Sequence, residues 1–257
     1  MKPTEQQENC PAKRKKKRTY PSSIQKVFRH VGRAADEFRM FEEGDRIMVG
    51  VSGTDSLCLL WVLRERLNWI PIRYDLKAVF VDPGFDERMG AIIKHYLQNQ
   101  GYDYEIIKTD IGLRAHSPEN RENTCFYCSW QRKKKLFAWA RENRCNKIAL
   151  GHHLEDINTT LLINIIYGGS ISTMMPRQDL FGGNLSIIRP LALLYKDQIT
   201  RLANDVGLPI LVNPCPSSAT SQRKEIGDIL NRFYQKDPRI RYTIFRSLQH
   251  VRNDYIP

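Results

Sequence analysis

The chain has 257 residues, of which 41% are hydrophobic, enough to build the core of one large domain. Its net charge of +12 and sequence pI of about 9.5 favour a polyanionic partner such as nucleic acid, although a basic protein without one is the alternative. No stretch approaches the ~20 apolar residues of a membrane helix, and the N-terminus lacks the apolar core of a secretory signal. We therefore expect a cytoplasmic protein with no membrane partner, whose six cysteines serve metal binding or catalysis rather than disulfides.

The N-terminal region divides into a charged tail and a helix. Residues 1–21 have few apolar side chains, and residues 13–18 are all Lys or Arg, so repulsion opposes folding there. This tail is predicted to be disordered, either as a basic arm on RNA phosphates or as a solvated segment of little consequence. A helix is predicted within residues 22–44, capped by Ser22 or Ser23, because apolar residues recur at helical spacing until the break at Gly44.

Strands alternate with helices through the middle of the chain. Strands are predicted at residues 47–51, 76–81, 104–107 and 147–150, and helices at residues 57–67, 87–99, 131–143 and 156–167. This alternation predicts βαβ units and hence an α/β fold, a parallel twisted sheet with helices on both faces. Because ligands of such sheets bind at the carboxyl ends of the strands, the chemistry is expected just after residues 51, 81 and 150.

The pattern changes after residue 170. Residues 181–184 predict a hairpin turn, residues 195–206 a helix, and residues 214–216 form a Pro-Cys-Pro loop before two last helices at 224–234 and 240–251. We predict four parts: a basic tail (1–21), an N-terminal helix (22–44), a nucleotide-binding α/β domain with the cysteine site (45–215) and C-terminal helices (216–257).

A strand, a short polar loop and a helix follow one another at residues 49–56, Val-Gly-Val-Ser-Gly-Thr-Asp-Ser. Small residues let the backbone approach a phosphate, and the first N–H groups of the helix point at an anion. Ser52 and Ser56 add hydroxyl donors, and Asp55 is suited to holding Mg²⁺. The Gly-Lys-Ser/Thr ending of the Walker loop is absent. The segment predicts a phosphate site, with an ordinary capped βα turn as the alternative.

Three cysteines form the second candidate site. Cys125 and Cys128 make a Cys-x-x-Cys pair at the start of a helix, and Cys215 lies in the rigid Pro-Cys-Pro loop. A helix N-terminus favours thiolates, and three thiolates from two loops hold a metal or cluster while leaving one position open. Thiolate ligation suits an iron–sulfur cluster or zinc. A redox pair, a zinc site completed by His152 or His153, and three unconnected thiols are the alternatives.

These features occur together, and together they resemble a known family. Ser-Gly-x-Asp-Ser at residues 52–56 is similar to the PP-loop of ATP pyrophosphatases, usually Ser-Gly-Gly-x-Asp-Ser, from which this chain departs by one missing residue. With the three cysteines and Gly-His-His-Leu-Glu-Asp at residues 151–156, the chain resembles the tRNA 2-thiocytidine synthetase (TtcA-like) family from about residue 41 to residue 251. Further similar stretches are residues 167–169, 188–191 and 221–223.

The resemblance implies an ATP site, a Mg²⁺ ion and a [4Fe–4S] cluster. The implied ATP-binding residues are Ser52, Gly53, Thr54, Asp55, Ser56, Asp82, Gly151 and His152. The implied catalytic residues are Asp55 and Asp156, and the implied cluster ligands are Cys125, Cys128 and Cys215. Plainer roles stay open for three of them: a helix cap for Asp156, a turn residue for Asp82, and a partner of a backbone carbonyl for His152.

The resemblance also implies an activity, ATP-dependent transfer of sulfur to a tRNA base. ATP would adenylate the C2 oxygen of a cytidine with loss of pyrophosphate, and sulfur would then displace AMP. The chemistry is reasonable because a ring carbonyl oxygen is a poor leaving group until it is adenylated. The implied partners are tRNA and a sulfur donor such as a cysteine desulfurase, and the resemblance suggests a homodimer and a cytidine of the anticodon loop.

Other functions use the same features. A ligase such as tRNA-lysidine synthetase could be built on the same scaffold. The missing loop residue motivates a cluster-dependent desulfurase or a degenerate PP-loop protein that does not use ATP. The tail and the net charge motivate a zinc-stabilised RNA-binding module without catalysis. Iron content and ATP-dependent release of pyrophosphate separate these cases.

Overall fold

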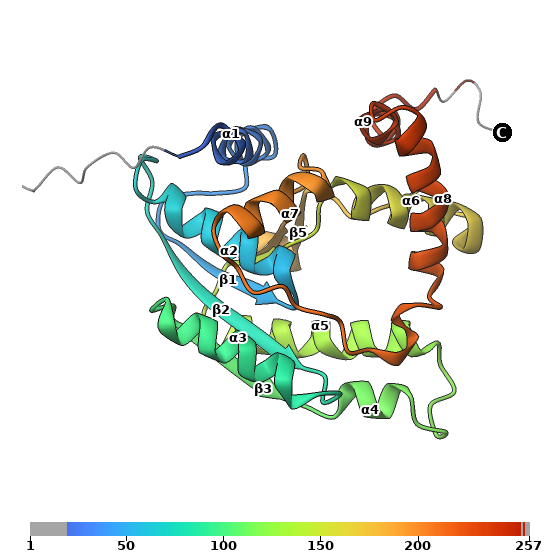
Figure 1. Cartoon of the computed structure of the whole chain (residues 1–257), viewed down its shortest axis with the longest axis horizontal. Helices are drawn as coiled ribbons and strands as arrows, with labels where there is room; N and C mark the ends of the chain where they lie inside the picture. Colours follow the sequence, from blue (N-terminus) through green and yellow to red (C-terminus); the bar gives the residue numbers. More distant parts are fainter. Residues whose placement is uncertain (1–19, 253, 255–257) are drawn as a thin grey trace, which may run out of the picture.

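The computed structural model describes residues 20–252 and residue 254, so most of the predicted basic tail lies outside the described residues. Its centre is a six-stranded sheet of order β3-β2-β1-β4-β6-β5 (Figure 1). The strands are β1 (Asp45–Val51), β2 (Tyr74–Asp82), β3 (Tyr104–Lys108), β4 (Lys147–Leu150), β5 (Arg177–Leu180) and β6 (Leu185–Ile188). All neighbours pair in parallel except the edge strand β5, which pairs antiparallel with β6. The predicted α/β fold and the hairpin before β6 are confirmed.

Strand β1 lies at the point where the order of the sheet reverses. It pairs with β2 on one side, Val49 opposite Ala78, and with β4 on the other, Val49 opposite Ala149. In a parallel sheet a crevice opens at such a point, beyond the carboxyl ends of the two strands. The loops after β1 and β4 must therefore meet there.

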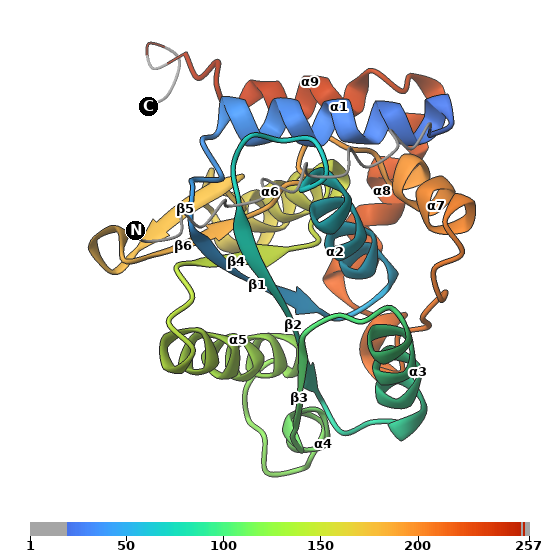
Figure 2. The same cartoon turned by 90° about the vertical axis from the view of Figure 1, so that its left-hand side faces the viewer.

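Helices cover both faces of this sheet (Figures 1 and 2). The main core joins one face to α1 (Ser22–Glu37), α2 (Thr54–Arg66), α3 (Glu87–Asn99) and α7 (Lys196–Asp205). On the opposite face, α5 (Thr124–Glu142) buries Trp139 and Ala140 against Met48, Val79 and Ile148. Removal of this apolar surface from water fixes both layers, at roughly 25 cal/mol per Å² buried.

The last helices form a third group that packs on α6 (Leu154–Gly168). Ile226, Leu230 and Tyr234 of α8 (Gln222–Lys236) make a small core with α6 and with α9 (Ile240–Ser247). Buried Asn158 of α6 donates to the Tyr234 hydroxyl at 3.1 Å and to the Arg241 carbonyl at 2.8 Å. Figure 1 shows α8 beside α6, away from the sheet. No helix in the described part of the chain is long and apolar enough to cross a membrane.

Several boundaries differ from the sequence-based expectation for local reasons. Helix α1 ends at Glu37, because Arg39 adopts a left-handed conformation (φ 48°) soon after it. A short helix, α4 (Ile111–Ala115), was not predicted. Helix α5 begins at Thr124 rather than at residue 131, because the Asn123 side chain accepts from the backbone N–H groups of Cys125 and Phe126. The Cys-x-x-Cys pair therefore lies inside the helix.

Candidate active site

The phosphate loop is a closed turn between β1 and α2. The Ser56 hydroxyl accepts from the backbone N–H groups of Ser52, at 2.8 Å, and Gly53, at 3.1 Å. It also donates to the Gly53 carbonyl at 2.7 Å. Gly53 is extended, with φ 177°, a conformation open to any residue, so the shortened loop needs no left-handed backbone. The N-terminus of α2, an anion-binding element, faces out of this turn.

Gly151 follows β4 and lies directly against this loop. A Cβ on Gly151 would lie 2.8 Å from the backbone nitrogen of Ser56 and 2.9 Å from its Cα. Backbone atoms cannot give way as a flexible side chain can, so only glycine fits there. The structure thus brings two of the predicted ATP-binding residues into contact across the switch point.

Thr54, the residue of α2 that follows Gly53, joins the loop to a distant segment. Its hydroxyl donates to the Pro209 carbonyl at 3.2 Å and accepts from the Leu211 N–H at 2.9 Å. Both bonds hold the segment of irregular structure that leads to Cys215. Thr54 therefore connects the phosphate loop with the third cysteine, a link that the sequence pattern did not indicate.

Carboxylates gather beside the loop, around one histidine. His153 places Nδ1 at 3.0 Å from a Glu155 oxygen, and Nε2 at 3.3 Å from Asp156 and 3.8 Å from Asp55. Both ring nitrogens face acceptors, which favours the doubly protonated ring. Burial by itself lowers the pKa of His153, but the hydrogen bond to Glu155 and the charges of Asp156 and Asp55 outweigh it, so the pKa is raised.

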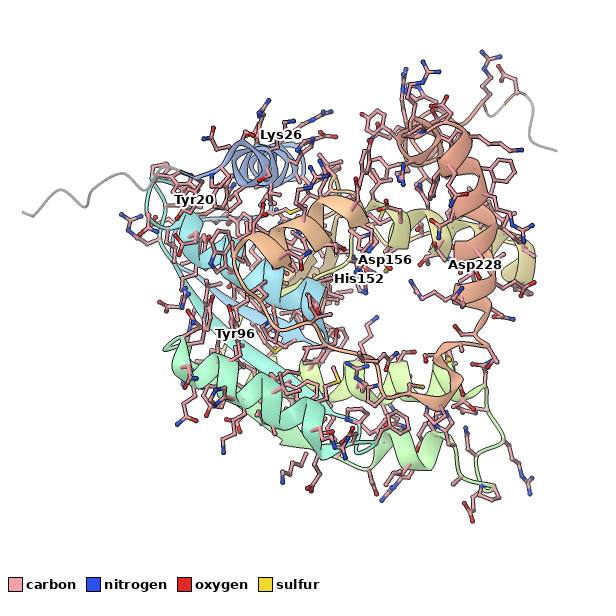
Figure 3. All side chains as sticks on the ribbon, viewed as in Figure 1. Tyr20, Lys26, Tyr96, His152, Asp156 and Asp228 are labelled. Atoms are coloured by element: carbon pink, nitrogen blue, oxygen red, sulfur yellow. The ribbon has the colours of Figure 1, made fainter. Side chains whose placement is uncertain are left out.

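Asp156 is predominantly ionised in this setting. Burial alone would raise its pKa, but the charge of His153, the hydrogen bond from the His153 backbone N–H and the charge of Arg223 outweigh burial and hold the pKa below its usual value. Its Oδ2 also accepts from the His153 backbone N–H at 3.1 Å, as in a helix cap. Asp156 therefore caps helix α6 and at the same time supplies a negative charge to the site. Figure 3 shows Asp156 and His152 close together at the start of α6.

Three cations from the C-terminal part of the chain complete this cluster. The Lys196 ammonium lies 2.6 Å from both oxygens of Asp55. Arg241 Nε donates to Glu155 at 3.0 Å, and Arg223 lies 3.4 Å from Asp156. None of the three was predicted as a site residue, and only Arg223 lies in a stretch that resembles the family.

Two predicted ATP-binding residues are engaged outside the carboxylate cluster. Burial lowers the pKa of His152 to about 4, and its neutral ring accepts from Arg189 Nε at 3.2 Å. Asp82 is buried at the end of β2, where its carboxylate accepts from the Gly84 N–H at 2.9 Å. The Asp82 contact is that of a turn residue, and the side chain does not line the cavity described next.

The three cysteines line the same cavity as Asp55 and Asp156. It has a volume of about 2070 Å³ and lies among α5, α6, α7, α8 and the segment around Cys215. Burial raises the pKa of the Cys128 thiol. The charges of Cys215 and Cys125 raise this pKa further, whereas the charge of Arg132 lowers it. In residues 20–252 and 254, no three His, Cys, Asp or Glu side chains are close enough to hold a single metal ion.

These observations test which group the cysteines fit. A set of three thiolates, with no histidine or carboxylate among them, is the donor set typical of iron–sulfur clusters. Arg132 Nε, beside Cys128, is buried with no hydrogen-bond partner among the described residues. The Arg132 side chain already acts on Cys128 through its charge and a hydrogen bond, so it is placed to donate to an anionic sulfur. The donor set therefore fits a cluster, and His152 and His153, the candidates to complete a zinc site, are held by Arg189 and Glu155.

His116, at the end of α4, is a neighbour of this site that the sequence did not reveal. Its Nε2 lies 2.8 Å from the Ser217 hydroxyl and 4.0 Å from Cys215 Sγ. Its Nδ1 faces the Gly112 carbonyl at 2.9 Å. A carbonyl only accepts, so Nδ1 carries the proton and Nε2 of the neutral ring is the acceptor. No local pattern marks a histidine 99 residues from the cysteine that it contacts.

A strand, a small-residue turn and a helix N-terminus at the switch point of a parallel sheet define a nucleotide-binding site of the PP-loop type. The profile of the PP-loop domain matches residues 23–228. The chain is 38% identical, over 87% of its length and 73% of the relative, to the tRNA-cytidine(32) 2-sulfurtransferase of Enterobacter sp. (strain 638). Identity to the protein of that name from Geotalea uraniireducens is 32%, over 90% of this chain and 93% of the relative.

The chain therefore belongs to the tRNA 2-thiocytidine synthetase family of PP-loop proteins. The Escherichia coli O127:H6 protein named tRNA-cytidine(32) 2-sulfurtransferase is 36% identical over 95% of this chain and 80% of its own. Among solved structures, the U34-tRNA thiolase NcsA from Methanococcus maripaludis with its [4Fe-4S] cluster superposes with a TM-score of 0.73. At 24% identity, over 91% of this chain and 82% of that one, the likeness concerns the fold.

Proposed function

We propose that this chain is an ATP-dependent tRNA sulfurtransferase that converts a cytidine to 2-thiocytidine. The names of its relatives give position 32 as the site of their target cytidine, and we propose the same position for this chain. One observation carries the proposal. The acidic phosphate-loop residue Asp55 and three cysteines open onto one cavity, so a nucleotide and a sulfur-bearing group can reach the same base.

The phosphate loop supplies the ATP site. The N-terminal amides of α2 and the Ser52 hydroxyl are suited to the phosphates, with Gly53 and Gly151 allowing close approach. The hydroxyl protons of Thr54 and Ser56 are committed to the Pro209 and Gly53 carbonyls, so these two residues would shape the ATP-binding loop and contribute their backbone N–H groups. Mg²⁺ is typically held by one or two carboxylates together with substrate phosphates, and Asp55 and Asp156 provide that number. Asp82 and His152 do not line the cavity, so we propose that they support the site from behind, through the turn after β2 and through Arg189, and do not touch the metal.

Cys125, Cys128 and Cys215 would hold a [4Fe–4S] cluster. When bound there, the cluster supplies an iron with a free coordination position at which sulfur is kept away from solvent. The residues around it have their own tasks. Arg132 offers an N–H to an anionic sulfur, and His116, through Ser217, fixes the loop that carries Cys215.

The reaction then balances in two displacements. The C2 oxygen of the cytidine attacks the α-phosphorus of ATP, and pyrophosphate leaves. Sulfide attacks C2, the C2–O bond breaks, and AMP leaves with the oxygen. The cations around Asp55 and Asp156 stabilise the charge that develops on phosphate oxygens, an effect that is strong where water is excluded. The α/β region 45–215 would carry this chemistry and the C-terminal helices 216–257 would form one wall.

Partners and location follow from the proposed reaction. The substrate is tRNA, and sulfur would come from a donor such as a cysteine desulfurase. A homodimer and a cytoplasmic location remain predictions from the family resemblance and the sequence.

The proposal is tested by mass spectrometry of tRNA nucleosides from cells that lack the gene. We expect loss of 2-thiocytidine, rescue by the intact gene and no rescue by Cys125→Ser. Cys145→Ser is the matched control, because Cys145 is a half-buried thiol that lies away from the cavity. An unchanged nucleoside profile would overturn the proposal and favour the alternative function, that of a degenerate PP-loop protein that does not use ATP. Loss of a different thionucleoside would overturn the assigned base.

A further inference from the structure

Lys196 begins α7 and reaches across to the phosphate loop. Its backbone N–H lies 3.2 and 3.1 Å from the two oxygens of Glu155, which fixes the start of the helix. Its side chain extends to Asp55, where the ammonium contacts both carboxylate oxygens at 2.6 Å. Residues 49–56 themselves contain no Lys or Arg. The loop therefore takes a positive charge from a helix 141 residues away.

This contact would compete with the binding of Mg²⁺ and ATP at the phosphate loop. A metal held by Asp55 needs the same oxygens, and it repels an ammonium at that distance. The phosphates of ATP arrive next to Asp55, at the N-terminus of α2, and bring several negative charges. Because its backbone stays anchored on Glu155, the Lys196 side chain remains within reach of those phosphates.

Two of the neighbouring cations, His153 and Arg241, are less free to make this exchange. The third, Arg223, is as exposed as Lys196 but lies against Asp156, at 3.4 Å, and not against Asp55. His153 is buried between Glu155 and Asp156, and its side chain is 8% exposed. Arg241 is engaged by Glu155, and its side chain is 20% exposed. The Lys196 side chain is 52% exposed, and its flexible stem can swing without breaking a packed core.

We propose that Lys196 is the phosphate-binding cation of this site and exchanges places with the metal. It neutralises Asp55 while the site is empty and moves to the ATP phosphates when Asp55 takes up Mg²⁺. This inference rests on the proposed use of ATP and goes beyond it, because it assigns a residue outside the PP-loop motif and explains how the lysine-free loop handles phosphate charge. Lys196 would thus keep free metal off Asp55 and favour the metal–nucleotide complex.

The test uses the full chain, isolated without oxygen, and two binding measurements with opposite expected outcomes. Electron paramagnetic resonance measures free Mn²⁺ in the absence of nucleotide. Lys196→Met should bind Mn²⁺ about fivefold more tightly, because an exposed ion pair that competes with the metal is lost. Equilibrium dialysis measures ATP with Mg²⁺, and Lys196→Met should bind it about tenfold more weakly, because a charge-assisted contact is lost.

Two further variants make the outcome specific. Lys196→Arg keeps the charge and should retain most of the ATP affinity. Lys26→Met removes an equal charge from the exposed face of α1, away from the site (Figure 3), and should change neither measurement. Iron content and thermal unfolding verify that each variant is folded, which is expected because the anchoring bond to Glu155 comes from the backbone.

The results separate this inference from the proposed function. If the intact chain binds ATP and Lys196→Met binds it equally well, the exchange is wrong and the sulfurtransferase proposal stands. Weaker binding of both Mn²⁺ and ATP would also contradict the exchange, because Lys196 would then not compete with the metal. If the intact chain binds no ATP, both proposals fail.

Discussion

At the scale of single residues, Thr54 stands in the PP-loop that is one residue shorter than usual, and its hydroxyl has a structural role. It pairs with Pro209 and Leu211 at once. Thr54→Val keeps the shape and leaves both backbone groups without this partner, which should lower the free energy of unfolding by about 1–2 kcal/mol. Hydrogen exchange at residues 208–215 should accelerate, because Thr54 ties that segment to the loop.

Thr54→Ser is the matched control, since it keeps the hydroxyl and removes only a methyl group. It should leave exchange at residues 208–215 close to that of the intact chain. Denaturant unfolding gives the free energies, and exchange mass spectrometry gives the local effect. Equal exchange in Thr54→Val and the intact chain would show that the segment is held by its other contacts.

At the scale of elements, the strands and most helices could be predicted because their apolar periodicity is local. The middle helix at Glu87–Asn99 matched its prediction at both ends. The start of α5 could not be located, because residues 124–130 mix Cys, aromatic and polar side chains and the signal is the single cap Asn123.

Site residues at the ends of strands could be predicted from the sequence. Site residues that contact partners distant in the sequence could not. Asp55, Gly151 and Asp156 follow β1 and β4, and parallel strands bring such positions together. The cations could not be predicted, because Lys196, Arg223 and Arg241 reach carboxylates 141, 67 and 86 residues away. The pairing is decided by how α7, α8 and α9 pack on the core.

The close contact between the ends of β1 and β4 predicts that position 151 tolerates only glycine. Gly151→Ala places a Cβ 2.8 Å from the Ser56 backbone, so the loop must shift. We expect stability to fall by about 1–3 kcal/mol, as for other overpacked sites, and ATP affinity to fall with it. Gly168→Ala is the control, because a Cβ there meets nothing within 4 Å and Gly168 has no positive φ.

Thermal or denaturant unfolding measures the stability of both variants, and equilibrium dialysis measures ATP. A Gly151→Ala protein with the stability and ATP affinity of the intact chain would mean that the loop adapts freely. In that case the close approach of the two strand ends would be incidental to nucleotide binding.

At the scale of the whole molecule, the cavity lies between parts that pack separately, and cations lie on both sides of it. Helix α5 on one side carries Arg132 in the cavity wall and the exposed residues Lys133, Lys134 and Lys135 next to it in sequence, and α8 on the other side carries Arg223 and Lys224 in the wall. Together with the net charge of +12, this arrangement suits a polyanion laid across the opening. The charge distribution therefore supports tRNA as the substrate independently of the cysteines.

This arrangement predicts a salt-dependent affinity for tRNA. Each neutralised phosphate releases counterions, so about four contacts should weaken binding roughly a hundredfold between ~50 mM and ~200 mM salt. Replacing Lys133, Lys134 and Lys135 together by Gln should flatten the slope of log affinity against log salt by about two to three. Lys26→Gln, on α1, should leave the slope unchanged, and filter binding over a salt series measures all three proteins.

Removal of residues 1–19, which include the Lys and Arg run at 13–18, should flatten the slope further while iron content stays constant. An affinity independent of salt would mean that the positive charge is not used to hold RNA, and that recognition rests on the cavity alone.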